Sequence, residues 1–193
     1  MSNTNATKIA LGESLKKLIR TKRLEKITIN DLTSDCGVSR MAFYYHFKDI
    51  YDLVEWVCME DGKRALRDKK TGDTWQEGIS RIFEAVLENK DFIINVCRSV
   101  GRERVERYLY RFTYDIVRYV VEEKCRDTGL SERQKDSITH FYKYGFVGTM
   151  LEWIDHGMKE DYREIVENMS VMLYENIDHS VCNFKRANEQ KTT

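Results

Sequence analysis

The side chains best suited to chemistry in this sequence lie together in residues 39–48, SRMAFYYHFK. This stretch combines an arginine, a lysine, a histidine and several hydroxyl groups with a methionine. Arginine and hydroxyl groups hydrogen-bond to base edges and phosphate oxygens, and apolar side chains contact thymine methyl groups. If the stretch is a short helix with Phe43 and Phe47 inward, its exposed face suits such contacts. The side chains on that face are Arg40, Met41, Tyr44 and Tyr45.

Two further predicted helices must position this stretch. Residues 7–22 carry apolar side chains at helical spacing, which predicts an amphipathic helix. Thr28 and Asp31 have the spacing of a short capping box, which predicts that a second helix begins there. Gly37 can adopt the left-handed backbone of a tight turn, and Ser39 is a suitable N-cap for the third helix. Two short helices joined by such a turn form a helix-turn-helix pattern.

The charge distribution is uneven along the chain. Residues 1–48 contain nine Lys or Arg and four Asp or Glu, an excess of five positive charges. The whole chain has 32 basic and 32 acidic residues, so the remainder carries 23 basic and 28 acidic ones. Charge alone fits a solvated surface as well as a contact with a polyanion. Together with the helix-turn-helix pattern, the basic first segment favours contact with nucleic acid.

Residues 27–53, ITINDLTSDCGVSRMAFYYHFKDIYDL, closely resemble the DNA-binding domain of the TetR family of transcriptional regulators. The family string runs T-[VI]-x-x-I-x-x-x-A-G-V-S-x-x-T-[LF]-Y-x-[HY]-F-x-x-K-x-x-L. Two positions depart from it: Ala42 replaces the usual threonine, and Ile50 replaces a phosphate-contacting lysine. Lys48 is the cation closest to that second position along the chain.

The resemblance implies DNA-binding roles for nine residues, and it includes Ala42 as a position of the reading helix. The expected phosphate contacts are Thr28, Ser39, Tyr44, His46 and Lys48. The expected base-edge contacts are Arg40, Met41 and Tyr45, and an arginine can bind guanine through two hydrogen bonds. Packing remains an alternative for three of these: Tyr44 and Tyr45 could pack against the first and fourth helices, and His46 could cap or pack near the next helix.

The rest of the chain shows helical patterns and no strand signal, so we expect an all-α fold. The segment 48–70 is expected to connect a helix-turn-helix domain, 1–48, to a helical effector-binding and dimerisation domain, 49–193. The later patterns cover residues 74–88, 91–98, 103–126, 132–157 and 162–182. Several of these segments resemble the dihydroxyacetone-kinase-type branch of the family. We expect the polar tail after Val181 to fray.

Two sets of residues in the larger domain are candidates for binding. The candidates for an amphipathic ligand cavity are Tyr108, Arg111, Tyr114, Arg118, His140 and Tyr144, for which ordinary packing and surface positions are the alternative. The resemblance also implies that the last two helices pair with a second subunit as a four-helix bundle. The candidates for that interface are Phe141, Gly145, Gly148, Trp153, Met169 and Leu173, which could instead pack within one subunit.

The sequence lacks the patterns of several other function classes. The five cysteines and four histidines show no metal-ligand spacing, so we predict no metal site and no cofactor. No nucleophile elbow, phosphate-binding loop or dinucleotide fingerprint occurs, which argues against an enzyme. No stretch approaches the roughly 18 apolar residues of a membrane span, and MSNTNATKIA lacks the apolar core of a signal peptide, so we expect no membrane contact and a cytoplasmic protein.

The resemblance therefore implies a homodimeric regulator, in the usual case a repressor, that binds double-stranded DNA at a near-palindromic operator. A small-molecule effector or a protein coregulator would modulate it through the helical domain. Two alternatives remain: a transcriptional activator that responds to a protein partner, and a helical interaction module without DNA binding.

Overall fold

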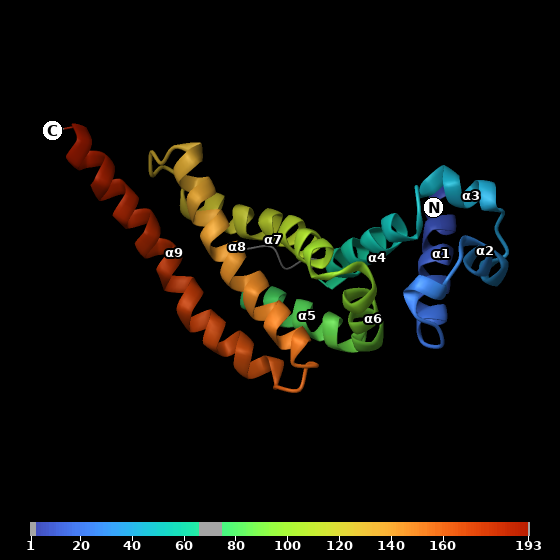
Figure 1. The fold of residues 1–193 in the computed structure, drawn as a ribbon. Coiled ribbons are helices and arrows are strands. Elements are labelled where there is room, and N and C mark those ends of the chain that lie inside the picture. Colours follow the sequence, from blue (N-terminus) through green and yellow to red (C-terminus); the bar gives the residue numbers. More distant parts are fainter. Residues whose placement is uncertain (1–2, 66–74, 193) are drawn as a thin grey trace. The chain divides into compact units, whose positions relative to one another are not determined.

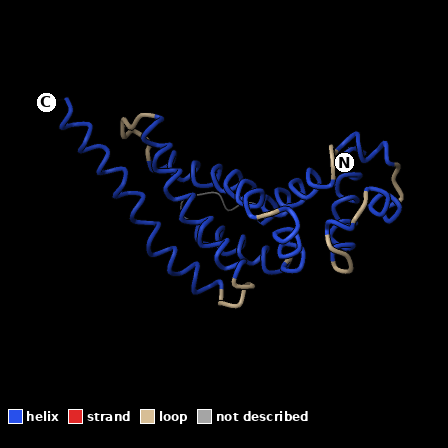
Figure 2. The backbone as a smooth tube through the Cα atoms, in the orientation of Figure 1, coloured by secondary structure: helices blue, strands red, loops and turns tan. Residues whose placement is uncertain are grey.

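A computed structural model describes the backbone of residues 3–65 and 75–192. In these ranges the chain forms nine α-helices and one short 3-10 helix, with no strand (Figure 2). The expectation of an all-α fold is confirmed. The side chains of residues 173–175 lie outside the described part, as do residues 66–70 of the expected connecting segment.

Residue contacts divide the chain into two compact units. Unit 1 comprises Met1–Lys63 and Glu88–Tyr108, and unit 2 comprises Arg64–Leu87 and Leu109–Thr193. This division differs from the predicted boundary at residue 48, because the segments after it return to pack with the first helices. A boundary drawn from sequence follows chain order, whereas these contacts join segments that are far apart in the sequence.

Unit 1 contains the N-terminal helices and two later segments (Figure 1). Its elements are α1 (Asn3–Ile19), η1 (Leu24–Lys26), α2 (Ile29–Cys36), α3 (Arg40–His46), α4 (Ile50–Ala65), α6 (Lys90–Val100) and the start of α7 (Arg102–Lys124). The core is formed by side chains with no exposed surface: Leu11, Leu15, Leu32, Phe43, Leu53 and Val54. These side chains come from all of the first four helices, so α3 packs against the other helices through its inner face.

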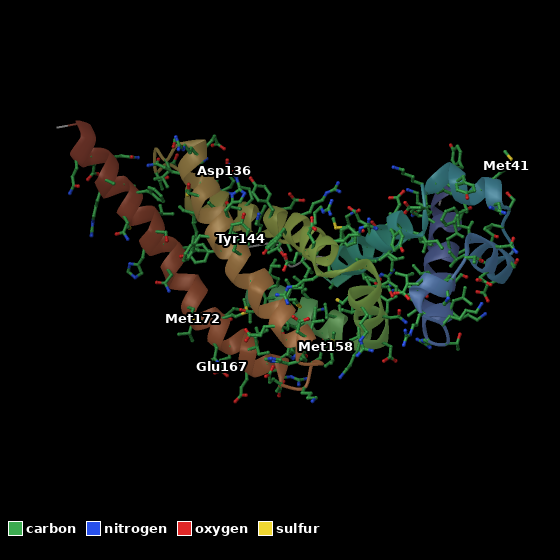
Figure 3. All side chains as sticks on the ribbon, viewed as in Figure 1. Met41, Asp136, Tyr144, Met158, Glu167 and Met172 are labelled. Carbon is green, nitrogen blue, oxygen red and sulfur yellow. The ribbon has the colours of Figure 1, made fainter. Side chains whose placement is uncertain are left out.

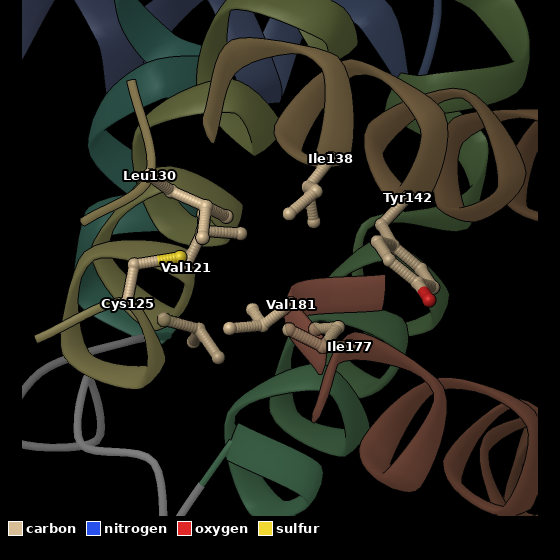
Figure 4. Close-up of a cluster of buried hydrophobic side chains, with 8 residues drawn as sticks. Val121, Cys125, Leu130, Ile138, Tyr142, Ile177 and Val181 are labelled. Atoms are coloured by element: carbon tan, nitrogen blue, oxygen red, sulfur yellow. The ribbon is translucent and has the colours of Figure 1, made fainter. Parts of the chain in front are cut away.

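Unit 2 contains α5 (Trp75–Glu88), most of α7, α8 (Glu132–Asp155) and α9 (Tyr162–Thr192). Gly157, with φ 74°, lies in the turn that joins α8 to α9, and these two helices run side by side (Figure 1). One part of the core joins α7, the following turn, α8 and α9 around Val121, Ile138 and Val181 (Figure 4). Another part surrounds Phe83, whose ring lies 5.1 Å from that of Trp153.

The expectation of a frayed tail after Val181 is wrong, since α9 continues to Thr192. Phe184 packs against the cluster shown in Figure 4, which anchors the helix beyond the expected end. One turn later, the side-chain amide of Gln134 donates a hydrogen bond of 2.8 Å to Asn188. These contacts with the start of α8 hold a polar segment whose composition alone suggests no partner.

Among the described residues, no helix combines the length and apolar character needed to cross a membrane.

Candidate nucleic-acid interface

The start of α2 is fixed by the predicted capping box. The Thr28 hydroxyl accepts a hydrogen bond of 3.1 Å from the Asp31 backbone N–H, and the Thr28 N–H donates to the Asp31 carboxylate at 2.9 Å. These bonds, with a further contribution from Lys22, lower the pKa of Asp31 from 3.8 to about 2. The carboxylate is therefore held in its ionised form.

The turn between α2 and α3 follows the predicted pattern. Gly37 ends α2 with a φ of 69°, in the left-handed region that a residue with a Cβ rarely adopts. Ser39 then caps α3, and its hydroxyl accepts a hydrogen bond of 3.0 Å from the Ala42 N–H. The turn and cap together fix where the reading helix begins.

The inner face of α3 is aromatic. Phe43 is fully buried and Phe47 is nearly so, with their rings 5.8 Å apart. The Phe47 ring also lies 5.8 Å from the Trp56 ring of α4. This packing fixes the rotation of the seven-residue helix and determines which side chains face solvent.

The outer face of α3 presents the predicted base-contacting side chains. Met41 is 82% exposed and Tyr45 is 79% exposed, and Arg40 is also exposed. Met41 projects away from the other helices of unit 1 (Figure 3). Tyr45 contacts the His46 ring at 4.9 Å and does not pack against α1 or α4, whereas half-exposed Tyr44 rests edge-on against Phe43 at 5.6 Å.

Cations near α3 differ in whether a carboxylate neutralises them. Lys16, Lys17 and Lys22 form ion pairs with Asp61, Asp35 and Asp31. In contrast, the side chains of Arg40 and Lys48 are exposed and make no ion pair within the described part of the chain. Arg40 and Lys48 are therefore available to an external anion, as are the exposed Arg20, Arg23 and Lys26, which also make no ion pair among the described residues.

The two positions that depart from the family string differ in environment. Ala42 is half-buried, and its N–H is the partner of Ser39. Ile50 begins α4 and is also half-buried, so it presents no charge there. Lys48 has an exposed side chain, while its backbone N–H donates to Asp52 at 2.9 Å. Lys48 thus brings a cation close to the start of α4.

Asn95 of α6 is a structural residue of this unit that the sequence did not indicate. Its amide nitrogen donates to the carbonyls of Ile19 and Lys22, both at 3.3 Å, and its amide oxygen accepts from the Leu24 N–H at 3.1 Å. One side chain therefore supplies hydrogen-bond partners for backbone groups at the end of α1 and the start of η1. No local pattern could have revealed it, because its partners lie more than 70 residues away.

The predicted ligand residues are only partly brought together. Tyr114, His140 and Tyr144 form a ring cluster, with centroid distances of 5.4 Å from His140 to Tyr114 and 6.0 Å to Tyr144. Tyr108 belongs to unit 1, and Arg111 is exposed.

Arg118 is already occupied by carboxylates. It pairs with Asp136 at 2.7 Å and also with Glu122 and Glu132. Tyr114 likewise donates its hydroxyl proton to Asp136 at 2.9 Å, which raises the pKa of the tyrosine. These bonds link α7 to α8 and leave Arg118 poorly suited to bind an anionic ligand.

Lys143, which no sequence pattern indicated, lies within the ring cluster. It is only 7% exposed, and its amine lies 4.6 Å from the Tyr144 ring centre and 5.2 Å from that of Tyr110. Burial lowers the pKa of this lysine. Its contacts with aromatic faces show how a cation is accommodated there without an ion pair in the described part.

The predicted interface residues lie partly on one surface of unit 2. Phe141 is 74% exposed, and a Cβ added to Gly145 or Gly148 would meet no heavy atom within 4 Å. Tyr144 of α8 and Met172 of α9, both labelled in Figure 3, are half-exposed on the same two helices. A groove of about 670 Å³ runs between α8 and α9. Met169 borders it but is only 3% exposed, so most of its side chain packs within its own subunit.

Trp153 does not belong to this surface. It is 1% exposed, packs against Phe83, and donates its indole N–H to the Glu160 carbonyl at 3.0 Å. The prediction that it contacts a second subunit is corrected, because its ring fills the core of its own subunit. The side chain of Leu173 lies outside the described residues.

The described residues contain no group of histidine, cysteine and acidic side chains placed to hold a metal ion. The five cysteines are free thiols. Burial raises the pKa of Cys58 to about 12, so this thiol is not activated.

Comparison with known proteins decides the family. The TetR model described as "Transcriptional regulator C-terminal region" matches residues 73–175, more than half of the chain. The chain belongs to the TetR family of transcriptional regulators. It resembles the DhaS branch within that family.

Two curated relatives are similar to parts of this TetR-family chain. The uncharacterised HTH-type transcriptional regulator YerO of Bacillus subtilis is 26% identical over 125 residues, covering 54% of this chain and 43% of YerO. The HTH-type dhaKLM operon transcriptional activator DhaS of Lactococcus lactis is 21% identical over 92 residues, covering 48% of this chain and 49% of DhaS. The chain thus matches just under half the length of each relative.

Solved structures share the fold. The dihydroxyacetone kinase operon activator DhaS superposes with a TM-score of 0.69 at 18% identity, covering 89% of this chain and 96% of that one. A TetR-family regulator from Streptomyces coelicolor gives a TM-score of 0.56 at 15% identity, covering 95% of this chain and 88% of that one.

Proposed function

We propose that this protein is a sequence-specific, DNA-binding transcriptional regulator that acts as a homodimer in the cytoplasm. The exposed face of α3 carries the proposal. Large apolar side chains are normally buried, yet Met41 and Tyr45 project into solvent beside an arginine that has no acidic partner in the described part. Such a face fits the major groove, whose base edges offer both hydrogen-bond partners and methyl groups.

The nine DNA-binding residues keep separate roles in this proposal. The protein would be positioned on DNA phosphates by Lys48, Thr28, Ser39, Tyr44 and His46. The small side chain of Ala42 would allow α3 to approach the DNA closely. Arg40, Met41 and Tyr45 would contact base edges. The Ser39 hydroxyl accepts a backbone hydrogen bond and keeps its proton for a phosphate oxygen. The Thr28 hydroxyl donates its proton to the Asp31 carboxylate at 2.9 Å, so it would contact phosphate only by redirecting that proton.

The experiment is selection of genomic fragments by the purified protein, followed by footprinting. We expect enrichment of a near-palindrome with half-sites about one helical turn apart. Arg20→Ala is the matched control for Arg40→Ala, because both remove one exposed arginine and only Arg40 lies on α3. Failure to enrich any sequence at low salt, or equal loss of selectivity in both variants, would contradict the proposal.

The surface formed by α8 and α9 supports the dimer. We define the pairing face as Phe141, Tyr144, Gly145 and Gly148 of α8 with Val171 and Met172 of α9. Its four large side chains are exposed in the single chain, and its two glycines leave room for a second helix. Exposed apolar side chains grouped in this way are typical of an interface.

Modulation by an effector or a protein coregulator through unit 2 is part of the same proposal. The sign of regulation has two candidates: repression, the usual mode of the family, and activation, the activity for which the DhaS relatives are named. A reporter placed behind the selected operator distinguishes them. Repression predicts higher expression when the regulator is deleted, and activation predicts lower expression.

A further inference from the structure

Lys8 of α1 is a cation of unit 1 that lies outside the helix-turn-helix pattern. It is half-buried, and its amine lies 5.8 Å from the ring centre of Phe47 and 6.0 Å from that of Trp56. One turn later on α1, a Cβ added to Gly12 would lie 3.2 Å from the Trp56 ring, so this part of α1 packs closely on α4. The first turns of α1 therefore lie at the same end of unit 1 as α3, which α1 also contacts (Figure 1).

No carboxylate neutralises Lys8 among the residues that the structure describes. Lys16, two turns further along α1, pairs with Asp61 at 2.6 Å, whereas the amine of Lys8 contacts only aromatic faces. An aromatic face attracts a cation but accepts no ordinary hydrogen bond. The three N–H donors of this amine therefore stay available to an external anion.

The acidic residues where α3 passes into α4 are directed to backbone groups. The Asp49 carboxylate accepts a hydrogen bond of 2.8 Å from the Asp52 N–H, and the Asp52 carboxylate accepts one of 2.9 Å from the Lys48 N–H. Ile50, the first residue of α4, brings no charge to this junction. Lys8 thus adds a cation from α1 to the one that Lys48 supplies.

The position of this amine suits a DNA phosphate. The seven residues of α3 span about 10 Å, close to the width of about 12 Å of the major groove, so both ends of a helix seated there lie near the phosphates along the groove walls. Phe47 directly follows α3, so an amine beside its ring lies at one of these ends. The two rings also restrict the amine, which reduces the side-chain freedom lost on binding.

We propose that Lys8 binds a phosphate of the DNA backbone beside the end of α3, so that α1 contributes to DNA binding as well as to the core of unit 1. This contact rests on the DNA-binding function proposed above. It would fix the position of α3 in the groove without reading sequence, because phosphates are the same at every base pair.

The test is an anisotropy titration of the full chain on the selected operator and on a scrambled duplex at several salt concentrations. Lys8→Met and Lys8→Gln remove the charge and keep an unbranched stem over the rings, whereas Lys8→Arg keeps the charge. Arg20→Met is the matched control, because it removes one exposed cation just beyond the other end of α1. Twelve helical residues span about 18 Å, more than the Debye length of about 10 Å at 0.1 M salt.

We expect both neutral Lys8 variants to reduce the slope of log K against log salt by about 0.9 on both duplexes, the effect of one lost phosphate contact. Discrimination between the duplexes and helix content should not change, and Lys8→Arg and Arg20→Met should keep the natural slope. A natural slope in both neutral Lys8 variants, or an equal decrease in Arg20→Met, would overturn the Lys8 contact and leave the proposed function standing. No binding of either duplex by the natural chain would contradict the proposed function itself and the contact with it.

Discussion

At the scale of single residues, the Thr28–Asp31 pair sets the start of α2. The contribution of this pair to the stability of the folded chain depends on pH. Folding lowers the pKa of Asp31 from 3.8 to about 2, so the ionised carboxylate stabilises the folded chain. The stabilisation is complete above pH 4 and is lost as the pH falls from about 4 to about 2.

We therefore expect Asp31→Asn to lower the melting temperature at pH 7. The difference from the natural chain should shrink as the pH falls from 4 to 2, because the natural carboxylate then becomes protonated as well. Thermal unfolding at several pH values measures this. A difference that stays constant down to pH 2 would show that the charge of Asp31 has no role.

Thr28→Ala tests the other half of the capping box. It removes the acceptor of the Asp31 N–H and should cost about 1 kcal/mol in the free energy of unfolding. Urea unfolding at pH 7 measures the loss, with Thr21→Ala as the control, since the exposed Thr21 hydroxyl makes one local bond of 3.2 Å to the Leu18 carbonyl and accepts no helix N–H. Equal losses in the two variants would contradict the capping role.

Buried threonines give a third prediction at this scale. Thr113→Val removes an unsatisfied hydroxyl and should raise the free energy of unfolding by about 1 kcal/mol. Thr139→Val removes a satisfied hydroxyl and should lower it slightly. Urea unfolding of both variants measures the sign, and destabilisation by Thr113→Val would show that its hydroxyl has a partner in solution.

The sequence predicted those site residues whose roles depend on neighbours along the chain. Thr28, Gly37 and Ser39 lie where short-range hydrogen bonds and backbone preference place them. The sequence also placed Tyr44 and Tyr45 on the exposed face of α3, where both lie. It could not show that Thr113 lacks a hydrogen-bond partner, because that depends on how helices distant in sequence pack.

At the scale of elements, α6 is tied to the end of α1 by Asn95. Asn95→Ala would leave the Leu24 N–H and two carbonyls without this partner, so we expect a loss of about 2 kcal/mol in the free energy of unfolding. Ser99→Ala is the control, because Ser99 only donates a long bond of 3.4 Å to Asn95. A similar small effect of both variants in urea unfolding would contradict the role of Asn95.

The glycines of α8 test the pairing face. Gly148→Arg adds a side chain where the single chain has open space and raises helix propensity, so the isolated subunit should stay folded. In a close-packed dimer the same side chain would clash, and we expect the variant to sediment as a monomer with unchanged helix content. A dimeric Gly148→Arg would place the interface elsewhere.

Most helices were predicted within a few residues because apolar periodicity marks them. The end of α9 was not, since its polar composition resembles a loose tail while its actual partners, the buried cluster around Phe184 and Gln134 of α8, lie elsewhere in the sequence. For the same reason the sequence boundary at residue 48 did not reveal that 88–108 packs within unit 1.

At the scale of the whole molecule, the proposed regulator reads DNA with unit 1 and pairs with a second copy through unit 2. Two reading helices in one dimer can occupy two half-sites, and each subunit would contribute its own phosphate contacts. Loss of the dimer should therefore weaken operator binding even when α3 is unchanged.

The measurement that tests the central claim most directly is a fluorescence anisotropy titration of the selected duplex at several salt concentrations. The natural chain, Arg40→Ala and Lys48→Ala should be compared on the operator and on a scrambled duplex. We predict that Arg40→Ala loses about 1–3 kcal/mol of discrimination between the two duplexes. Lys48→Ala should weaken binding to both alike and reduce the salt dependence. If both variants bind both duplexes as the natural chain does, α3 is not the element that reads DNA.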